Sequence, residues 1–275
     1  MFLRLREKIV SCFGSQTVAS DNLGDLVKQA ALSHRQGVIS LAEAREKLRK
    51  IYPNMVDEDD SILQSLVLNE KIDQVLERYR NDENVYKYFY GYPYQSLNIA
   101  NVFGDRVCDY RFDEYELSKF ISPSDRVLDV GCNCGFMALL ASYRTGCFSV
   151  GLDINPYMIE IGQLTSEFLR IQDITELYCK KIQDYYPGIL FNVVFSFATH
   201  WTDDQNYRVS LRSHLERMAS YLEVGGVLLF ESHCNDIGSE DFYKVVEGAR
   251  DIFDFNGCYK KTDSGSREYY VMKKK

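Results

Sequence analysis

The sequence lacks several features that define common classes of protein. It contains no run of about 18 to 20 apolar residues, the length that a membrane-spanning helix requires. It also lacks an excess of basic residues, because 32 Lys and Arg stand against 40 Asp and Glu and leave a net charge of -8. We therefore expect no stable membrane insertion and no DNA partner, since an extended basic surface is missing.

The N-terminus lacks the pattern of a secretory signal. Its first ten residues, MFLRLREKIV, alternate charged and apolar side chains too closely for the apolar part of such a signal. We therefore expect a cytoplasmic protein. The same segment is amphipathic and locally basic, so it either packs on its own domain or lies on a membrane surface.

Signatures of metal and nucleotide binding are also missing. Cys132 and Cys134 lie two residues apart, but no second Cys/His pair follows at the spacing of a zinc site, and we expect no metal. The other cysteines are scattered, and we expect most to be buried. The turn 131–135 carries Asn133, and Phe136 follows it, where a dinucleotide fingerprint needs glycines. NAD, FAD and nucleoside triphosphates are thereby disfavoured, since a G-K-[ST] sequence is absent too.

What the sequence does contain is helical periodicity followed by alternating strands and helices. Three amphipathic helices are predicted between Asp21 and Arg80, the last of them over 61–80. A further helix is predicted over 112–121. Strands are predicted at 126–131, 148–154, 176–182, 191–197 and 226–232, and helices between them at 136–144, 156–170 and 204–222. Such alternation predicts a parallel sheet covered on both faces.

The last part of the chain departs from this alternation. Residues 258–262 and 267–274 read as two strands joined by the short turn DSGS, which predicts a C-terminal antiparallel hairpin. We place the domain boundary near residue 95, with a helical N-terminal extension over 1–95 and an α/β domain over 96–275. Just before this boundary, the tyrosine-rich segment 86–94 either packs in the core or forms a lid over a ligand.

The segment VLDVGCNCGFMALLA resembles motif I of the class I S-adenosylmethionine-dependent methyltransferases. Four further segments resemble motifs of that family in the same order: VGLDINPYMIEIGQ, CKKIQDYY, FNVVFSFATHWT and YLEVGGVLLFESH. The resemblance extends from about residue 112 to the C-terminus. It implies a Rossmann-like, seven-stranded, mostly parallel sheet, S-adenosyl-L-methionine as the cofactor, and methylation as the activity.

The resemblance also implies which residues bind the cofactor. Asp153 would hold the ribose hydroxyls, and its place 24 residues after Asp129 agrees with the spacing of an acidic residue that binds ribose. Asn133 stands where the family commonly has glycine, but asparagine tolerates the left-handed conformation that such a turn needs. Asp184 or Gln183 would contact the adenine. The complete set that we expect to bind the cofactor is Asp129, Gly131, Cys132, Asn133, Gly135, Asp153, Ile154, Gln183, Asp184, Tyr185, Phe197 and Ala198.

Candidates for catalysis follow the fourth and fifth predicted strands. His200, His233 and Glu231 would lie on the reaction side of the sheet, and an imidazole is the group best suited to accept a proton at neutral pH. Each of them could instead pack or bind the acceptor. Trp201, the only tryptophan, would form a wall for the acceptor or anchor its loop. The acidic segment 202–206 is better explained as a helix N-terminus than as a metal site.

Three functions remain open from the sequence. The first is methyl transfer to a hydroxyl of a small molecule or glycan, by in-line displacement at the sulfonium. The second is modification of tRNA, because the segment VFGDRVCDYRF and the residues ESH distantly resemble enzymes that act on the tRNA wobble uridine; the acidic composition weakens it. The third is a catalytically silent platform that binds the cofactor. The acceptor, the need for a general base and the oligomeric state are not encoded in any recognisable pattern.

Overall fold

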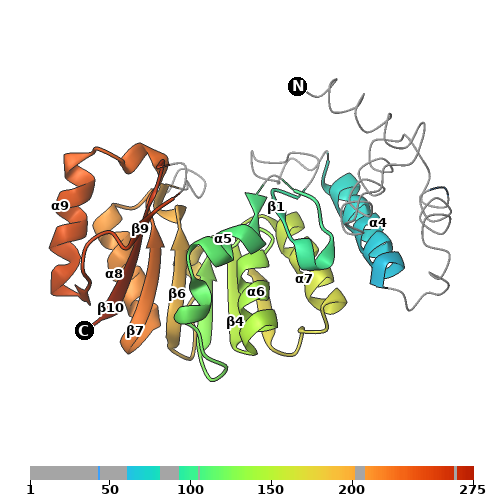
Figure 1. The fold of residues 1–275 in the computed structure, drawn as a ribbon, viewed down its shortest axis with the longest axis horizontal. Coiled ribbons are helices and arrows are strands. Elements are labelled where there is room, and N and C mark those ends of the chain that lie inside the picture. Colours follow the sequence, from blue (N-terminus) through green and yellow to red (C-terminus); the bar gives the residue numbers. More distant parts are fainter. Residues whose placement is uncertain (1–42, 44–60, 81–92, 105, 202–207, 263–264) are drawn as a thin grey trace.

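An eight-stranded sheet forms the centre of the computed structural model, which describes Glu43 and residues 61–80, 93–104, 106–201, 208–262 and 265–275 (Figure 1). The strand order is β5-β4-β3-β6-β7-β10-β8, and β9 pairs with β10. The parallel strands are β3 Arg126–Val130, β4 Phe148–Asp153, β5 Thr175–Cys179, β6 Phe191–Phe197 and β7 Leu222–Glu231. The strands β8 Phe253–Asp254, β9 Lys260–Lys261 and β10 Glu268–Lys274 form the antiparallel part.

Helices cover both faces of this sheet. They are α4 Ser61–Tyr79, α5 Cys108–Glu114, α6 Phe136–Thr145, α7 Pro156–Phe168, α8 Leu211–Tyr221 and α9 Glu240–Gly248. Single 3-10 turns are η1 Asn98–Ala100, η2 Leu117–Lys119, η3 Ile182–Asp184, η4 Thr199–Trp201, η5 Cys234–Asp236 and η6 Ala249–Asp251. A separate parallel pair, β1 Gln95–Ser96 and β2 Arg106–Val107, lies outside the main sheet. Figure 1 shows α5 and α6 in front of the central strands.

The two faces of the sheet are specified by alternation along each strand. Val127, Phe195 and Leu229 belong to the core that contains residues of α4 to α7. Their neighbours Leu128 and Val194 belong to a second core built with α8 and α9. Because side chains alternate between faces with a period of two, the face of every polar residue farther along these strands is also determined.

The helix α4 is joined to the sheet domain through α7. Its buried side chains share one apolar core with residues of α6 and α7; they are Leu68, Ile72, Val75 and Leu76. Arg78 of α4 also forms an ion pair with Glu160 of α7. The last of the three predicted N-terminal helices is thus confirmed. The first two, apart from the helical residue Glu43, and residues 86–92 of the tyrosine-rich segment lie outside the described residues.

The predicted α/β fold with a mostly parallel, Rossmann-like sheet and a C-terminal hairpin is confirmed, with three local differences. The short strand β8 brings the sheet to eight strands instead of seven. The predicted helix over 112–121 is instead α5, which ends before Glu116, a residue with a positive φ of 54°, and the turn η2. The helix predicted from 204 begins at Leu211, because the Ser210 hydroxyl caps it by accepting the Ser213 N–H at 3.1 Å.

The burial of the cysteines is only partly as expected. Cys108, Cys132, Cys134 and Cys147 are buried, whereas Cys179, Cys234 and Cys258 are exposed. All seven of these described cysteines are free thiols. Among the described helices, none combines the length and the apolar character needed to cross a membrane.

Candidate functional site

The winding of the sheet reverses between β3 and β6. From β3 the chain continues outward through β4 and β5, and then returns to place β6 on the other side of β3. In open parallel sheets, ligands bind beyond the carboxyl ends of the strands at this reversal. The turn 131–135, which follows β3, therefore occupies the expected position for a ligand site.

The turn 131–135 is built from left-handed backbone conformations. Gly131, Asn133 and Gly135 have φ values of 68°, 55° and 71°, and the expectation that Asn133 adopts this conformation is confirmed. A Cβ at Gly131 would lie 2.4 Å from the Thr199 Cγ2, so η4 can approach the turn only because glycine stands there. Cys132 closes the turn by accepting the Gly135 N–H through its carbonyl at 2.8 Å.

Asp129 lies just before this turn and is nearly fully buried, with 3% exposed. Its Oδ2 has no hydrogen-bond partner within the described part of the chain. Burial raises the pKa of Asp129 to about 7; the nearby Arg111 guanidinium acts against this shift and Asp153 adds to it. A buried carboxylate oxygen without a donor, next to a guanidinium, fits the ammonium and carboxylate of an amino acid.

Asp153 ends β4 and connects it to the turn. Its Oδ2 accepts the Asn133 N–H at 2.9 Å, and its Oδ1 accepts the Asn155 N–H at 2.9 Å. These contacts hold the carboxylate at the carboxyl end of the strand. Ile154 follows it, and its carbonyl oxygen accepts the Cys179 thiol at 3.5 Å. The position of Asp153 fits the binding of sugar hydroxyls.

The two residues expected to contact adenine lie in the turn η3 after β5 and differ in burial. Asp184 is exposed, whereas Gln183 is half-buried and its Oε1 is buried without a partner in the described structure. Tyr185 is buried, and its hydroxyl has a pKa raised to about 12 chiefly by burial. The unpaired acceptor on Gln183 fits an exocyclic amino group better than the exposed carboxylate does.

The end of β6 carries the apolar residues expected near the reacting group. Phe197 is half-buried, and the Arg111 guanidinium lies over its ring at 4.8 Å from the centroid. Ala198 has a positive φ of 61°, which is uncommon for a residue with a Cβ. Its N–H donates to the Glu231 carbonyl at 3.0 Å, which ties the ends of β6 and β7 together.

Glu231 occupies the α5 face of the sheet and is only 2% exposed. Its carboxylate accepts the Tyr115 hydroxyl at 2.5 Å, forms an ion pair with Arg111, and forms another with Arg267 at 3.3 Å. Two guanidinium groups and a tyrosine hydroxyl therefore converge on this one carboxylate. These contacts suit a residue that orients its neighbours.

His200 lies on the opposite side, against α8 and α9. Its Nε2 is 2.8 Å from the Asp236 Oδ2, so this nitrogen carries the proton, while Nδ1 is buried without a partner in the described structure. Its ring lies 5.2 Å from that of Phe230, centroid to centroid. The structure therefore separates His200 from Glu231 by the thickness of the sheet.

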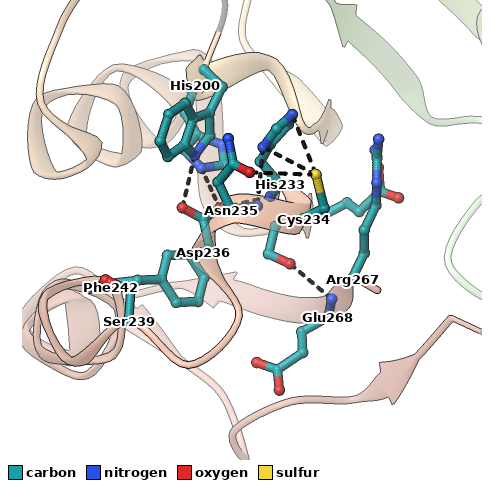
Figure 2. Close-up of polar contacts among 12 residues, drawn as sticks. His200, His233, Cys234, Asn235, Asp236, Ser239, Phe242, Arg267 and Glu268 are labelled. Atoms are coloured by element: carbon teal, nitrogen blue, oxygen red, sulfur yellow. Dashed lines mark hydrogen bonds and ion pairs between the residues drawn. The ribbon is translucent and has the colours of Figure 1, made fainter. Parts of the chain in front are cut away.

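His233 precedes the turn η5, and Figure 2 shows its ring on the same side of the chain as the Arg267 guanidinium. The Asn235 N–H donates to His233 Nδ1 at 3.2 Å, so the proton of the neutral ring is on Nε2. Burial lowers the pKa of His233, and Arg267 lowers it further. Trp201 stacks on this ring at 5.1 Å between centroids and is anchored by a 2.7 Å hydrogen bond from its Nε1 to Asp236.

Sequence reasoning missed four residues of this region. They are Gln95, Arg111, Arg267 and Asp236. Gln95 comes from β1, and its side-chain oxygen accepts the first N–H of α6, that of Phe136, at 3.3 Å. Arg111 lies in the segment VFGDRVCDYRF, which the sequence analysis connects with a possible acceptor but with no individual residue. Asp236 lies just after the fifth motif, and neither Gln95 nor Arg267 falls in a recognisable motif.

The described part of the chain offers no cluster of side chains that could serve as metal ligands. Among the residues that the structure describes, no three His, Cys, Asp or Glu side chains are placed to hold a metal ion. The acidic segment 202–206 lies outside those residues.

Comparisons with known proteins give a family match and several similar structures. A family profile described as "Methyltransferase domain" matches residues 121–275. Among solved structures, a methyltransferase from Thiobacillus denitrificans in complex with S-adenosyl-L-homocysteine is 18% identical, with 46% of this chain and 47% of that chain covered and a TM-score of 0.39. A methyltransferase from Geobacter sulfurreducens, also in complex with S-adenosyl-L-homocysteine, is 20% identical, with 45% of this chain and 47% of that chain covered and a TM-score of 0.40.

A third similar structure is geranyl diphosphate C-methyltransferase from Streptomyces coelicolor A3(2). It is 15% identical, with 61% of this chain and 75% of that chain covered and a TM-score of 0.46. The match to the first two structures spans about half of their length. A search of curated proteins gives no match. The profile match covers more than half of the chain, so the chain belongs to the methyltransferase domain family, and its predicted place among the class I S-adenosylmethionine-dependent methyltransferases is confirmed.

Proposed function

We propose that this protein transfers the methyl group of S-adenosylmethionine to a hydroxyl oxygen of a small-molecule or glycan acceptor. The observation that carries the cofactor assignment is the unpartnered buried oxygen of Asp129, with the positive charge of Arg111 in its vicinity. Together they match the ammonium and carboxylate of the methionine end. When bound, S-adenosylmethionine supplies a methyl group on an electrophilic sulfonium.

The protein's own residues would bind the remaining parts of the cofactor. Asp153 would accept hydrogen bonds from the ribose hydroxyls, and Gln183 would accept one from the adenine amino group. Phe197 and Ala198 would form an apolar wall that limits access of water to the reacting atoms. Alignment of the reactants supplies much of the rate enhancement in such a site. Exclusion of water strengthens the electrostatic contribution of the surrounding dipoles.

The roles of His200, His233 and Glu231 remain proposals. Neither histidine presents an unprotonated nitrogen to the edge of the sheet: His200 Nδ1 is buried, and His233 Nδ1 is occupied by the Asn235 N–H. We propose that His233 and Glu231 position the acceptor and its neighbours, while His200 holds the η5 turn through Asp236. The hydroxyl proton would then pass to water.

Calorimetric titration with S-adenosylhomocysteine tests the cofactor assignment. We expect saturable binding by the wild type and a loss of at least tenfold in affinity for Asp153→Asn, since a charged hydrogen bond contributes about 1.5 to 3 kcal/mol. The matched control is Asp173→Asn, because Asp173 is exposed and lies in the loop between α7 and β5. Absence of binding by the folded wild type would refute the assignment.

Transfer of label from methyl-labelled S-adenosylmethionine tests the acceptor. Fractions of a cell extract that contain small metabolites, glycans or tRNA are supplied separately. Label in the first or second fraction supports the proposal. Label confined to tRNA favours the alternative of a tRNA-modifying enzyme, and cofactor binding without labelling of any fraction favours a silent platform.

A further inference from the structure

Positive charge accumulates beyond the ends of β6 and β7. Arg111 and Arg267 both pair with the single carboxylate of Glu231, so two guanidinium groups share one carboxylate there. The side chain of Arg267 is only partly buried, with 22% exposed. A third cation, Arg208, lies over the Trp201 ring at 4.0 Å from its centroid.

The neighbouring carboxylate of Asp236 is held by other donors, and within the described part of the chain it forms no ion pair with Arg267 or Arg208. Asp236 accepts three hydrogen bonds: from His200 Nε2 at 2.8 Å, from Trp201 Nε1 at 2.7 Å and from the His233 N–H at 2.6 Å. Among the described residues, no carboxylate forms an ion pair with Arg208.

His233 adds a hydrogen-bond donor of defined orientation to the same region. Its Nδ1 accepts the Asn235 N–H, and therefore its Nε2 carries hydrogen in the neutral ring. Its ring stacks on that of Trp201, over which Arg208 lies, and the positive charges of Arg267 and Arg208 both lower the pKa of His233. Figure 2 shows the His233 ring and the Arg267 side chain extending to the same side of the chain.

We propose that the acceptor carries an anionic group, a carboxylate or a phosphate, that is bound by Arg267, Arg208 and the Nε2–H of His233. The inference rests on the proposed function, since it describes the acceptor of that reaction. Guanidinium groups bind such anions through two parallel hydrogen bonds, and a neutral imidazole N–H adds a third donor. Glu231 fixes the direction of Arg267, and Asp236 fixes the indole that supports Arg208.

The single tryptophan makes this site directly measurable, because all tryptophan fluorescence comes from Trp201. The full-length protein, saturated with S-adenosylhomocysteine, is titrated with inorganic phosphate and separately with acetate, at ionic strength held constant with sodium chloride. We expect a saturable fluorescence change with at least one of the two anions. The anion that saturates at lower concentration identifies the preferred group.

Three variants complete the test. Arg267→Gln and Arg208→Gln should each lower the affinity for the anion at least tenfold. The affinity for S-adenosylhomocysteine, measured by calorimetry, should stay within about twofold of the wild-type value. Arg170→Gln is the matched control, because Arg170 is an exposed arginine at the end of α7. Arg267→Lys retains the charge without the planar fork, and should give an intermediate affinity if Arg267→Gln fails to fold.

The outcomes separate this inference from the proposed function. Wild-type protein that binds S-adenosylhomocysteine but responds to neither anion beyond the chloride control overturns the inference alone. Equal weakening by Arg170→Gln, or unchanged anion affinity in Arg267→Gln and Arg208→Gln, overturns it too. Failure of S-adenosylhomocysteine to bind overturns the proposed function, whatever the anions do.

Discussion

Asp129 is the residue whose protonation depends most directly on the ligand. Because its pKa is raised to about 7, roughly half of the carboxyl groups are protonated at neutral pH before a ligand binds. An ammonium group next to the unpartnered Oδ2 favours the ionised form and lowers this pKa. Binding of the cofactor at pH 7 should therefore release protons.

This first prediction can be measured by calorimetry. Binding of S-adenosylhomocysteine at pH 7 in buffers of different ionisation enthalpy should reveal release of about half a proton per site. Asp129→Asn should still fold and should remove this release. A proton release that persists unchanged in the variant would assign it to another group.

At the scale of single residues, the sequence predicts backbone conformation better than it predicts which side chains contact one another. The left-handed Asn133 could be predicted, because conformational tolerance is a property of the side chain itself. Arg111, Glu231 and Arg267 could not be brought together in this way, since they lie far apart along the chain and only the folded sheet places them within reach. The nitrogen that carries the proton in each histidine likewise depends on tertiary hydrogen bonds.

At the scale of elements, the close contact between α7 and the turn 131–135 depends on Gly162. A Cβ at this position would lie 2.3 Å from the Cys134 carbonyl oxygen and 2.5 Å from the Leu177 Cδ1. The missing side chain allows the helix to support the turn directly. Displacement of α7 would therefore be transmitted to the residues that hold the ligand.

The second prediction concerns this contact. Gly162→Ala should lower the free energy of unfolding by about 1 to 2 kcal/mol, because overpacking outweighs the better helix propensity of alanine. Gly248→Ala is the control: it lies at the end of α9 with open space around its Cβ, and it should be neutral or slightly stabilising. Urea unfolding measures both. Equal stability of the two variants would contradict the proposed support.

The elements themselves were largely predictable, and their ends were not. The five parallel strands follow from apolar runs separated by helical periodicity, a local pattern. The start of α8 at Leu211 depends on which of several polar residues caps the helix, and that choice is made by the backbone path into it. The strand β8 has only two residues, too few for any periodicity to reveal.

At the scale of the whole molecule, two buried groups give opposite responses to acid. Burial lowers the pKa of His214 to about 3, and the ring is held by the Ser196 hydroxyl at 2.8 Å. As pH falls below about 6.5, the unfolded chain protonates this histidine and the folded chain does not, so stability is lost. Asp129 acts oppositely, because the folded state takes up its proton from about pH 7 downward and gains stability.

The third prediction follows from the signs of these shifts. Between pH 7 and pH 5 each group changes the free energy of unfolding by about 2 kcal/mol, and the two contributions nearly cancel in the wild type. His214→Gln should become more stable on acidification, and Asp129→Asn less stable. Urea titrations at both pH values measure the differences; parallel changes in all three proteins would refute this account.

The fourth prediction concerns the division near residue 95. Because α4 shares an apolar core with α6 and α7, removal of residues 1–95 should expose that surface. We expect the fragment 96–275 to have a lower melting temperature than the full chain, or to aggregate. Equal stability in calorimetry would show that the sheet domain folds independently.

The burial of Cys132 and Cys134 inside the turn has a practical consequence. Both are free, both are among the least accessible thiols described, and three other thiols are exposed and provide an internal reference. Alkylation followed by peptide mass spectrometry should therefore label Cys179, Cys234 and Cys258 first, and the two turn cysteines only during local opening. The labelling rate of those two would then report how often the turn 131–135 opens. Slower labelling in the presence of S-adenosylhomocysteine would show that the ligand suppresses this opening.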